Sequence, residues 1–266
     1  MKAKFYADIF LSYSLQNLKT RLAYRGNFFF GVFGIIIYSV VNIGFLWAIF
    51  SNIDGLKGWR FEEVLFIYGM GQFVFGIFSV FFLNFAHKLP KHYIVDGHLD
   101  RPLLRPLSPY FQLILENLNF NDLMIILKGM IIMMYCFHLL QLKWHLLTLA
   151  EILLFGLSGA LVYAGVWVTT ASLSFWFKNM SGFFIALYTL NHYSRFPITI
   201  YPFWIRFIFT WILPLAFVAF FPSAYFLPDK GFNTTALFVP LIGCLVFGIS
   251  LMVWNAGLKK YESTGT

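Results

Sequence analysis

The sequence predicts an all-α integral membrane protein with six transmembrane helices, an N-terminal amphipathic interfacial helix and a re-entrant helical hairpin before the last span. Apolar residues make up 60% of the 266 residues and charged residues only 11%, against roughly 25% charged residues in soluble proteins. The mean hydropathy is +0.75, and charge-free runs fill most of the chain. This composition excludes a soluble fold. The net charge of +8 therefore indicates membrane topology and lipid contact rather than nucleic-acid binding.

Residues 1–25 are predicted to form a cytoplasmic helix that lies on the membrane surface. The segment carries five basic residues and lacks the apolar core of a cleavable signal peptide. Its leucines recur at helical spacing among polar residues, at Leu11, Leu15, Leu18 and Leu22. Because this spacing places them on one face, an amphipathic interfacial helix is predicted. A simple basic anchor is the alternative.

Seven segments are candidates for membrane spans, because a helix needs about 20 apolar residues to cross about 30 Å of hydrocarbon. Five are free of charged residues: 26–53, 64–87, 152–177, 207–228 and 231–258. Two contain ionisable residues: 118–142, with Asp122 and Lys128, and 179–200, with His192 and Arg195. Both cysteines, Cys136 and Cys244, lie in apolar runs, which is typical of buried thiols.

Pro214 governs the interpretation of residues 207–228. If all seven segments crossed, Lys259 and Lys260 would lie outside, against the preference of basic residues for the cytoplasmic side. Pro214 breaks a helix there, so half-helices at 202–213 and 215–225, the second containing Pro222, are predicted to enter the outer leaflet and return. Residues 201–228 are then an external re-entrant segment, and 12 basic residues are cytoplasmic against six external. A seven-span chain with an external C-terminus is the alternative.

Residues 88–116 form a predicted cytoplasmic loop with the most specific motif in the chain, DGHLDRPLLRPLSP at 96–109. Its three prolines within eight residues prevent a long helix. Short amphipathic pieces are therefore predicted to present Asp100, Arg101 and Arg105 at the inner surface. This arrangement suits docking of a soluble partner, and a basic loop in contact with anionic lipid is the alternative.

The sequence lacks the motifs of the common enzyme classes. It contains no GxxxxGK[ST], HExxH, GxSxG or CxxC, so any energy from ATP must come from a partner, and no cofactor or metal is predicted. His87, His92 and His98 lie near the inner end of the second span. Gaps of five and six residues do not place them on one helical face, so they are interpreted as interfacial histidines.

Lys128 and Arg195 are the candidates for a transport pathway. An ionisable group within a span costs about 3 kcal/mol at its centre and usually faces protein, water or a partner. A second interpretation of Lys128 is open. If its span begins near Leu123, Lys128 lies about 8 Å deep in the membrane, and its side chain can reach the inner head groups. The two cations hint at anionic cargo without defining it. Asn42 is interpreted as a structural hydrogen-bonding residue.

The fourth span carries small residues at intervals of three and four along residues 158–170. Such residues allow close approach of another helix. The pattern predicts a packing surface, for a helix of the same chain or of a second protomer.

These features resemble a permease subunit of the type-2 ABC exporter superfamily, in the bacterial group described as ABC-2 family transporter proteins. The resemblance rests on the loop residues GHLD at 97–100 and LRPLSP at 104–109, and on the outer segment with RFP at 195–197, YP at 201–202, PLAF at 214–217 and FPSA at 221–224. It also rests on the overall layout of interfacial helix, six spans and re-entrant element. The similarity extends over nearly the whole chain.

The resemblance implies a permease in the bacterial inner membrane, with both termini cytoplasmic, that pairs as a homo- or heterodimer. Each protomer would dock on a separately encoded ATPase subunit, with Asp100, Arg101 and Arg105 as candidate contacts. The substrate would pass between the protomers, and the hairpin with Pro214 and Pro222 would form part of the outer gate. A stand-alone ion-coupled carrier or an integral membrane enzyme is the alternative.

Overall fold

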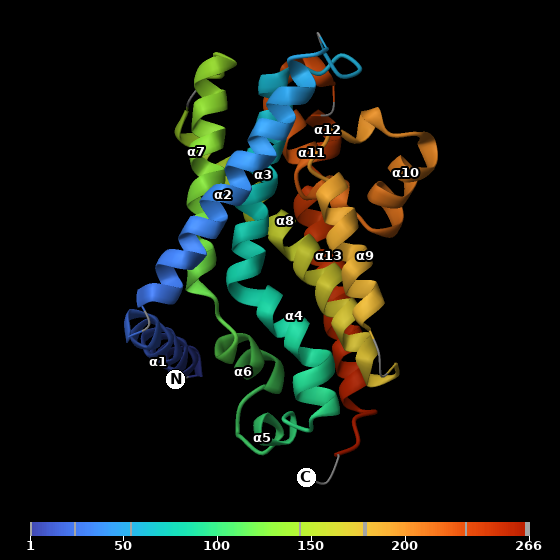
Figure 1. Ribbon diagram of the computed structural model, residues 1–266. Helices are drawn as coiled ribbons and strands as arrows, with labels where there is room; N and C mark the ends of the chain where they lie inside the picture. Colours follow the sequence, from blue (N-terminus) through green and yellow to red (C-terminus); the bar gives the residue numbers. More distant parts are fainter. Residues whose placement is uncertain are drawn as a thin grey trace.

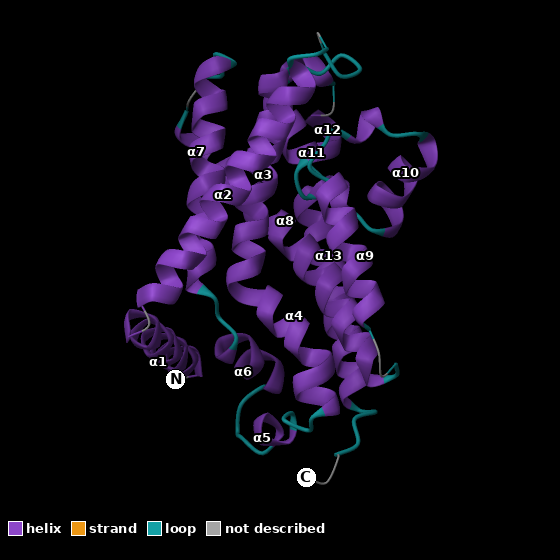
Figure 2. Ribbon diagram, in the orientation of Figure 1, coloured by secondary structure: helices purple, strands orange, loops and turns teal. Residues whose placement is uncertain are grey.

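The computed structural model describes residues 2–23, 25–53, 55–143, 145–177, 180–231 and 233–263. These residues form helices joined by loops, with no strand among them (Figure 2). The long helices run side by side as a bundle (Figure 1): α2 (Arg25–Phe50), α3 (Phe61–Phe78), α7 (Leu123–Leu139), α8 (Leu146–Ser172) and α13 (Val239–Leu258). The all-α membrane fold predicted from composition is confirmed.

Within the described residues, five helical segments are long and apolar enough to cross a membrane: Phe29–Phe50, Phe61–Val95, Phe120–Leu139, Leu146–Phe175 and Thr234–Leu258. The second is longer than predicted, because the helix does not end at His87. It continues from α3 through a π-helical turn, Ser79–Leu83, α4 (Asn84–Lys88) and a second π-helical turn, Leu89–Val95. Pro90 lies within this continuous segment, at the start of the second π-helical turn, and irregular helical turns of this kind accommodate the hydrogen bond that its missing N–H cannot make.

Both ends of the described chain lie at the same end of the bundle (Figure 1). We call this the basal end. It consists of α1 (Lys2–Ala23), α5 (Asp100–Leu103), α6 (Pro109–Glu116) and residues 259–263. Arg105 donates a hydrogen bond to Tyr13 of α1 (3.1 Å). Tyr261 and Ser263 donate hydrogen bonds to the Asp100 carboxylate (3.0 and 2.7 Å). The chain therefore traverses the bundle an even number of times, unlike the seven-span alternative.

The helix α1 lies across the basal end at an angle to the bundle (Figure 1). Its Tyr6 ring packs edge-on against Phe111 of α6 (5.2 Å between centroids), and Asn17 donates to the carbonyl of Leu118 (2.9 Å). Leu11 and Leu15 are exposed, as expected on a helix whose apolar face meets lipid. Leu18 and Leu22 are not among the residues whose side chains the structure describes.

The fifth predicted span, 179–200, is a shorter helix than expected, α9 (Ser181–Tyr193). Pro197 accounts for this, because the residue before a proline disfavours helical geometry. The segment still reaches from one end of the bundle to the other. Phe184 packs against His87 of α4 (5.2 Å between centroids), whereas Thr199 accepts a hydrogen bond from Trp59 Nε1 (2.8 Å) in the loop before α3. This loop, residues 55–60, and residues 199–230 form what we call the distal end.

The chain forms the hairpin predicted around Pro214. Its arms are Phe203–Ile212, which includes α10 (Phe203–Phe207), and Leu215–Phe226, which includes α11 (Phe220–Phe226), and they are bent by 76°. Both ends of the segment lie at the distal end: the Ile200 carbonyl accepts from Lys57 (3.0 Å) and the Gly58 carbonyl accepts from Lys230 (2.8 Å). The hairpin therefore enters and leaves on the same side. The short helix α12 (Asn233–Ala236) leads into α13.

The small residues of α8 pack against helices of the same chain. A Cβ at Gly165 would lie 2.7 Å from the backbone of Val246 on α13, and one at Gly243 on α13 would lie 2.5 Å from the Ser158 carbonyl oxygen. The sequence pattern left open whether the neighbouring helix belongs to the same chain or to a second protomer. At these positions it is α13 of the same chain. These close contacts lie on the face of α13 that meets α8. Cys244, also on α13, is exposed, contrary to the prediction of a buried thiol. Cys136 is buried as predicted.

Candidate functional site

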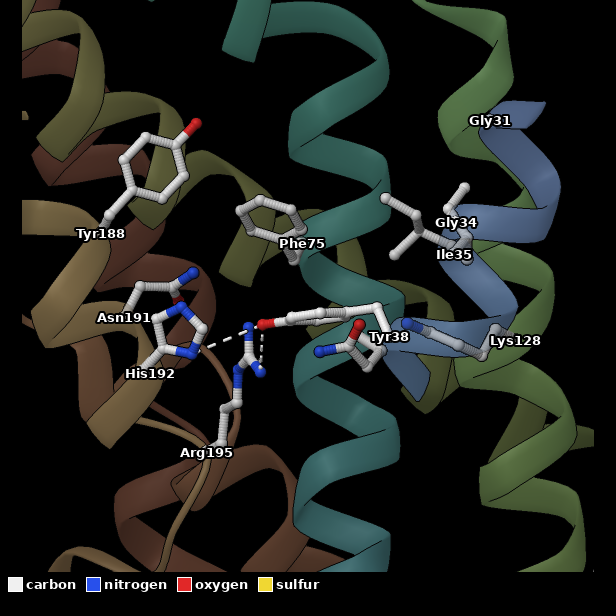
Figure 3. Close-up of a pocket in the computed structure, with 12 residues that line it drawn as sticks. Gly31, Gly34, Ile35, Tyr38, Phe75, Lys128, Tyr188, Asn191, His192 and Arg195 are labelled. Carbon is white, nitrogen blue, oxygen red and sulfur yellow. Dashed lines mark hydrogen bonds between the residues drawn. The ribbon is translucent and has the colours of Figure 1, made fainter. Parts of the chain in front are cut away.

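A cavity of about 350 Å³ lies in the bundle between α2, α3, α7 and α9 (Figure 3). The helix α7 contributes a cation and α3 an amide. The helix α9 contributes three polar side chains, and the turn after it contributes a second cation. The lining residues are Gly31, Gly34, Ile35, Tyr38, Gln72, Phe75, Ile125, Lys128, Tyr188, Asn191, His192 and Arg195. Both pathway candidates predicted from the sequence, Lys128 and Arg195, therefore line one cavity, although they are 67 positions apart in the chain.

Arg195 is held by neutral groups of α2. Its Nη1 donates to the Tyr38 hydroxyl (3.0 Å) and to Asn42 Oδ1 (3.1 Å). Its guanidinium carbon lies 5.6 Å from the Tyr38 ring centroid and 5.9 Å from that of Tyr68, within range of cation–π attraction. Arg195 follows the end of α9, where the chain leaves the helix, and this turn directs its side chain toward α2 (Figure 3).

Lys128 reaches the cavity from the opposite side. The helix α7 begins at Leu123, as assumed in the depth estimate, but the side chain points toward the cavity (Figure 3). Within the described chain it makes no hydrogen bond or ion pair. The structure thus places Lys128 at the cavity wall, and its role in a pathway remains a prediction.

A second cavity of about 170 Å³ adjoins the first, and the two share His192 and Arg195. Together they follow α2 from Gly31 to Leu46, roughly 22 Å at 1.5 Å per residue. The Arg195 side chain therefore stands at the junction of two cavities that extend over much of the bundle depth. Both cavities border α2, most of whose apolar side chains are exposed, including Phe33, Ile37 and Val41.

The polar partners of Arg195 were the part of this site that the sequence did not reveal. Asn42 makes the structural hydrogen bond predicted for it, to the Tyr38 carbonyl (2.6 Å), but it also accepts from Arg195. Tyr38 accepts from Arg195 and lies 3.5 Å from His192 Nδ1. The available signal was that Tyr38 and Asn42 are polar and four positions apart, hence on one face of an otherwise apolar span.

The basal loop holds the three predicted ATPase contacts in different environments. Asp100 binds the C-terminal tail through Tyr261 and Ser263. Arg105 binds Tyr13 and pairs with Glu116 (3.4 Å). Arg101 is exposed, and Leu104, beside them, has 88% of its side chain exposed. Asp100 and Arg105 thus connect the loop to the tail and to α1, with Arg105 still exposed, whereas Arg101 and Leu104 lie on the outer surface of the loop.

We expect Asp100→Ala to release the C-terminal tail. Burial, followed by the hydrogen bond to Asp100, raises the pKa of Tyr261 to about 12, so the phenol remains a donor at neutral pH. A hydrogen bond to a charged group contributes about 1.5–3 kcal/mol, and less where water competes, so trypsin should cleave after Lys260 roughly fivefold faster in the variant.

Asp96→Ala is the matched control, because Asp96 is an exposed carboxylate of the same loop and makes no hydrogen bond to the described tail residues, 259–263. Cleavage is measured by mass spectrometry of the released peptide. Equal cleavage rates for the two variants would show that Asp100 does not retain the tail.

The three histidines of the second span do not gather at one site. The His87 ring stacks on Trp167 (5.5 Å between centroids), whereas the rings of His92 and His98 lie 4.3 Å apart in the loop region. No group of three or more potential metal ligands occurs among the described residues. The aromatic packing of His87 agrees with a structural role.

The family model described as ABC-2 family transporter protein matches residues 36–265. The chain belongs to the ABC-2 transporter family. Comparison with curated proteins and with solved structures gives no match. The match includes the basal loop, the hairpin and both cations of the cavity. This ABC-2 transporter protein is thus a multi-pass membrane protein and a permease component of an ABC transporter, as the resemblance implied.

Proposed function

We propose that this ABC-2 transporter protein is the membrane subunit of an ATP-driven exporter in the bacterial inner membrane, with its basal end in the cytoplasm and docked on a separate ATPase subunit. The observation that carries the proposal is the basal loop, which exposes Leu104 and Arg101 on a braced platform. An exposed leucine beside a cation suits a protein partner better than water, because burial of an exposed leucine side chain is favourable by roughly 2 kcal/mol.

The loop is connected to the helices that line the cavity. The Leu99 N–H donates to the Tyr93 carbonyl (3.0 Å), and the Asn119 N–H donates to the Val80 carbonyl (2.9 Å) in the second span. Asn117 donates to the Tyr93 hydroxyl (2.7 Å). A displacement of the loop by an ATPase would therefore act on the segment 61–95, which contributes Gln72 and Phe75 to the cavity.

The same proposal assigns the exposed face of α2 to a second protomer, as a homo- or heterodimer. Phe33, Ile37 and Val41 recur at intervals of four on that face and are exposed, and both cavities border the helix. A partner packed there would place the cavities beside the dimer axis. The substrate would then pass along Lys128 and Arg195, and the hairpin with Pro214 and Pro222 would close the external end of its route.

The docking role is tested with a candidate ABC ATPase subunit, sought first among the genes that neighbour this one, co-expressed and purified through a tag on the permease. We expect the double variant Arg101→Glu with Leu104→Gln to recover about tenfold less ATPase than the wild type, since loss of a central contact costs about 2 kcal/mol or more. The measurement is the ratio of ATPase to permease in the eluate.

Leu146→Gln is the matched control, because Leu146 is also 88% exposed but begins α8, at the opposite end of the bundle. It should recover the ATPase like the wild type. Full recovery by the loop variant would refute docking at Leu104, and absence of any recovered ATPase with the wild type would favour a stand-alone carrier or enzyme.

A further inference from the structure

The cavity between α2, α7 and α9 carries an uncompensated positive charge. Two of its twelve described lining residues, Lys128 and Arg195, are cations, and none of the twelve is acidic. The hydrogen-bond partners of Arg195 are neutral groups, Tyr38 and Asn42. Lys128 and Arg195 are each partly withdrawn from the surface, and charges removed from water are normally paired in proteins. The described lining of this cavity supplies no counter-ion for them.

The site lies deep in the span, which increases the need of its cations for a counter-ion. Tyr38 lies 13 positions after Arg25, the first residue of α2, which is roughly 20 Å along a helix and close to the middle of the span. Cations at such depth occur at ion and substrate pathways or beside a partner charge. Contact with the Tyr38 and Tyr68 rings stabilises the guanidinium in part without neutralising it.

The shape and walls of the cavity indicate which chemical groups a bound ligand would carry. Within the described chain, both hydrogen bonds of Arg195 use Nη1, which leaves the Nη2 edge of its planar fork for two oxygens of a carboxylate or phosphate. Ile35, Phe75 and Ile125 supply apolar walls. A Cβ at Gly34 would meet no atom within 4 Å, so α2 leaves open space on this side. A charged head and an apolar tail would both be accommodated.

We propose that this cavity binds the anionic head group, carboxylate or phosphate, of an amphiphile, with Arg195 and Lys128 holding the head from opposite sides and the tail lying against α2. The inference rests on the proposed function of the cavity as part of the transport pathway and names the class of its substrate. His192, 3.5 Å from the Tyr38 hydroxyl, orients the polar side of the site.

The test is native mass spectrometry of the full-length protein in dodecyl maltoside, titrated with octyl phosphate, octanoate or uncharged octyl glucoside. The wild type should bind one octyl phosphate or one octanoate per chain, at least tenfold more tightly than octyl glucoside. Lys128→Met and Arg195→Met should each weaken anion binding about tenfold, and the double variant about a hundredfold. Lys128→Arg, which keeps the charge, should bind like the wild type.

Lys143→Met is the matched control, because Lys143 is an exposed lysine outside the cavity and its loss should leave binding unchanged. Preference for one of the two anions would support the proposal and identify the head group. Equal affinity for octyl glucoside, or unchanged anion binding by a monodisperse Lys128→Met variant, would overturn it. Because no ATPase is present, this result is independent of the docking experiment, and either proposal can fail alone.

Discussion

Gly129→Ala is expected to prevent the close packing of α3 against α7 and to lower the melting temperature of the purified protein sharply. A Cβ at Gly129 would lie 2.4 Å from the Phe73 backbone nitrogen and 2.8 Å from the Gly69 carbonyl oxygen. These are backbone atoms of a packed helix and cannot move aside singly. Overpacking of a core costs about 1–3 kcal/mol, occasionally more, and contact with backbone should place this variant at the upper end.

The contact is repeated along the same pair of helices. A Cβ at Gly76 would lie 2.7 Å from the Ile126 backbone nitrogen, and one at Gly69 would lie 2.9 Å from Cγ2 of Ile132. The two helices therefore touch closely over a considerable length, as small residues permit in membrane proteins. Gly129 follows Lys128 directly, so this packing also sets the direction in which Lys128 meets the cavity.

Gly44→Ala is the matched control for this prediction. Gly44 lies on α2, and a Cβ there would meet no atom within 4 Å. Because alanine favours a helix over glycine by about 1 kcal/mol, the control should be neutral or slightly stabilising, opposite in sign to Gly129→Ala. Melting followed by intrinsic tryptophan fluorescence in detergent separates the two, and equal curves would contradict the close contact.

The spans could be predicted from the sequence because the bilayer acts on each residue separately. A long apolar run, as in Thr234–Leu258, must cross or lie within lipid whatever its neighbours are. The hairpin was predictable for a similar reason, since Pro214 disrupts a helix in any environment. The continuation of the second span to Val95 was not, because it depends on π-helical turns that no single residue type specifies.

The cavity depends on contacts between distant segments, which a single sequence does not contain. Lys128 and Arg195 were predicted as isolated pathway residues, whereas their common cavity and the roles of Tyr38 and Asn42 required the packed structure. The loop shows the same division: its motif predicted exposure of Asp100 and Arg105 along with Arg101. Arg101 and Arg105 are exposed as predicted, whereas Asp100 is only partly exposed. The sequence did not reveal that Asp100 binds the C-terminal tail and that Arg105 binds α1, because each partner comes from elsewhere in the chain.

Lys230→Met is expected to destabilise the distal end by about 3–5 kcal/mol, the usual effect of removing one partner of a buried ion pair. Lys230 Nζ lies 2.8 Å from Glu63 Oε2, and the side chains are 16% and 4% exposed. It also donates to the Gly58 carbonyl and lies 4.5 Å from the Trp59 ring centroid. Its loss would leave the Glu63 carboxylate buried, with Arg60 as its one remaining charged partner among the described residues.

The pair is informative because Lys230 lies where the chain leaves the hairpin, whereas Glu63 lies in the first turn of α3. It therefore fastens the hairpin to a helix that lines the cavity. Lys230→Met should lower the melting temperature and increase proteolysis of the segment 227–231. Combining it with Glu63→Gln, which removes the unpaired charge, should restore much of the loss.

Arg60→Met is the matched control, because Arg60 also pairs with Glu63 (3.3 Å) but is 64% exposed. Pairs exposed in this way contribute about 1 kcal/mol or less, so this variant should melt close to the wild type. An effect of Arg60→Met as large as that of Lys230→Met would mean that Arg60 supplies the main counter-charge of Glu63. Failure of Glu63→Gln to relieve Lys230→Met would place the contribution of Lys230 in its contacts with Gly58 and Trp59, and the hairpin would then be held by the loop before α3 rather than by α3 itself.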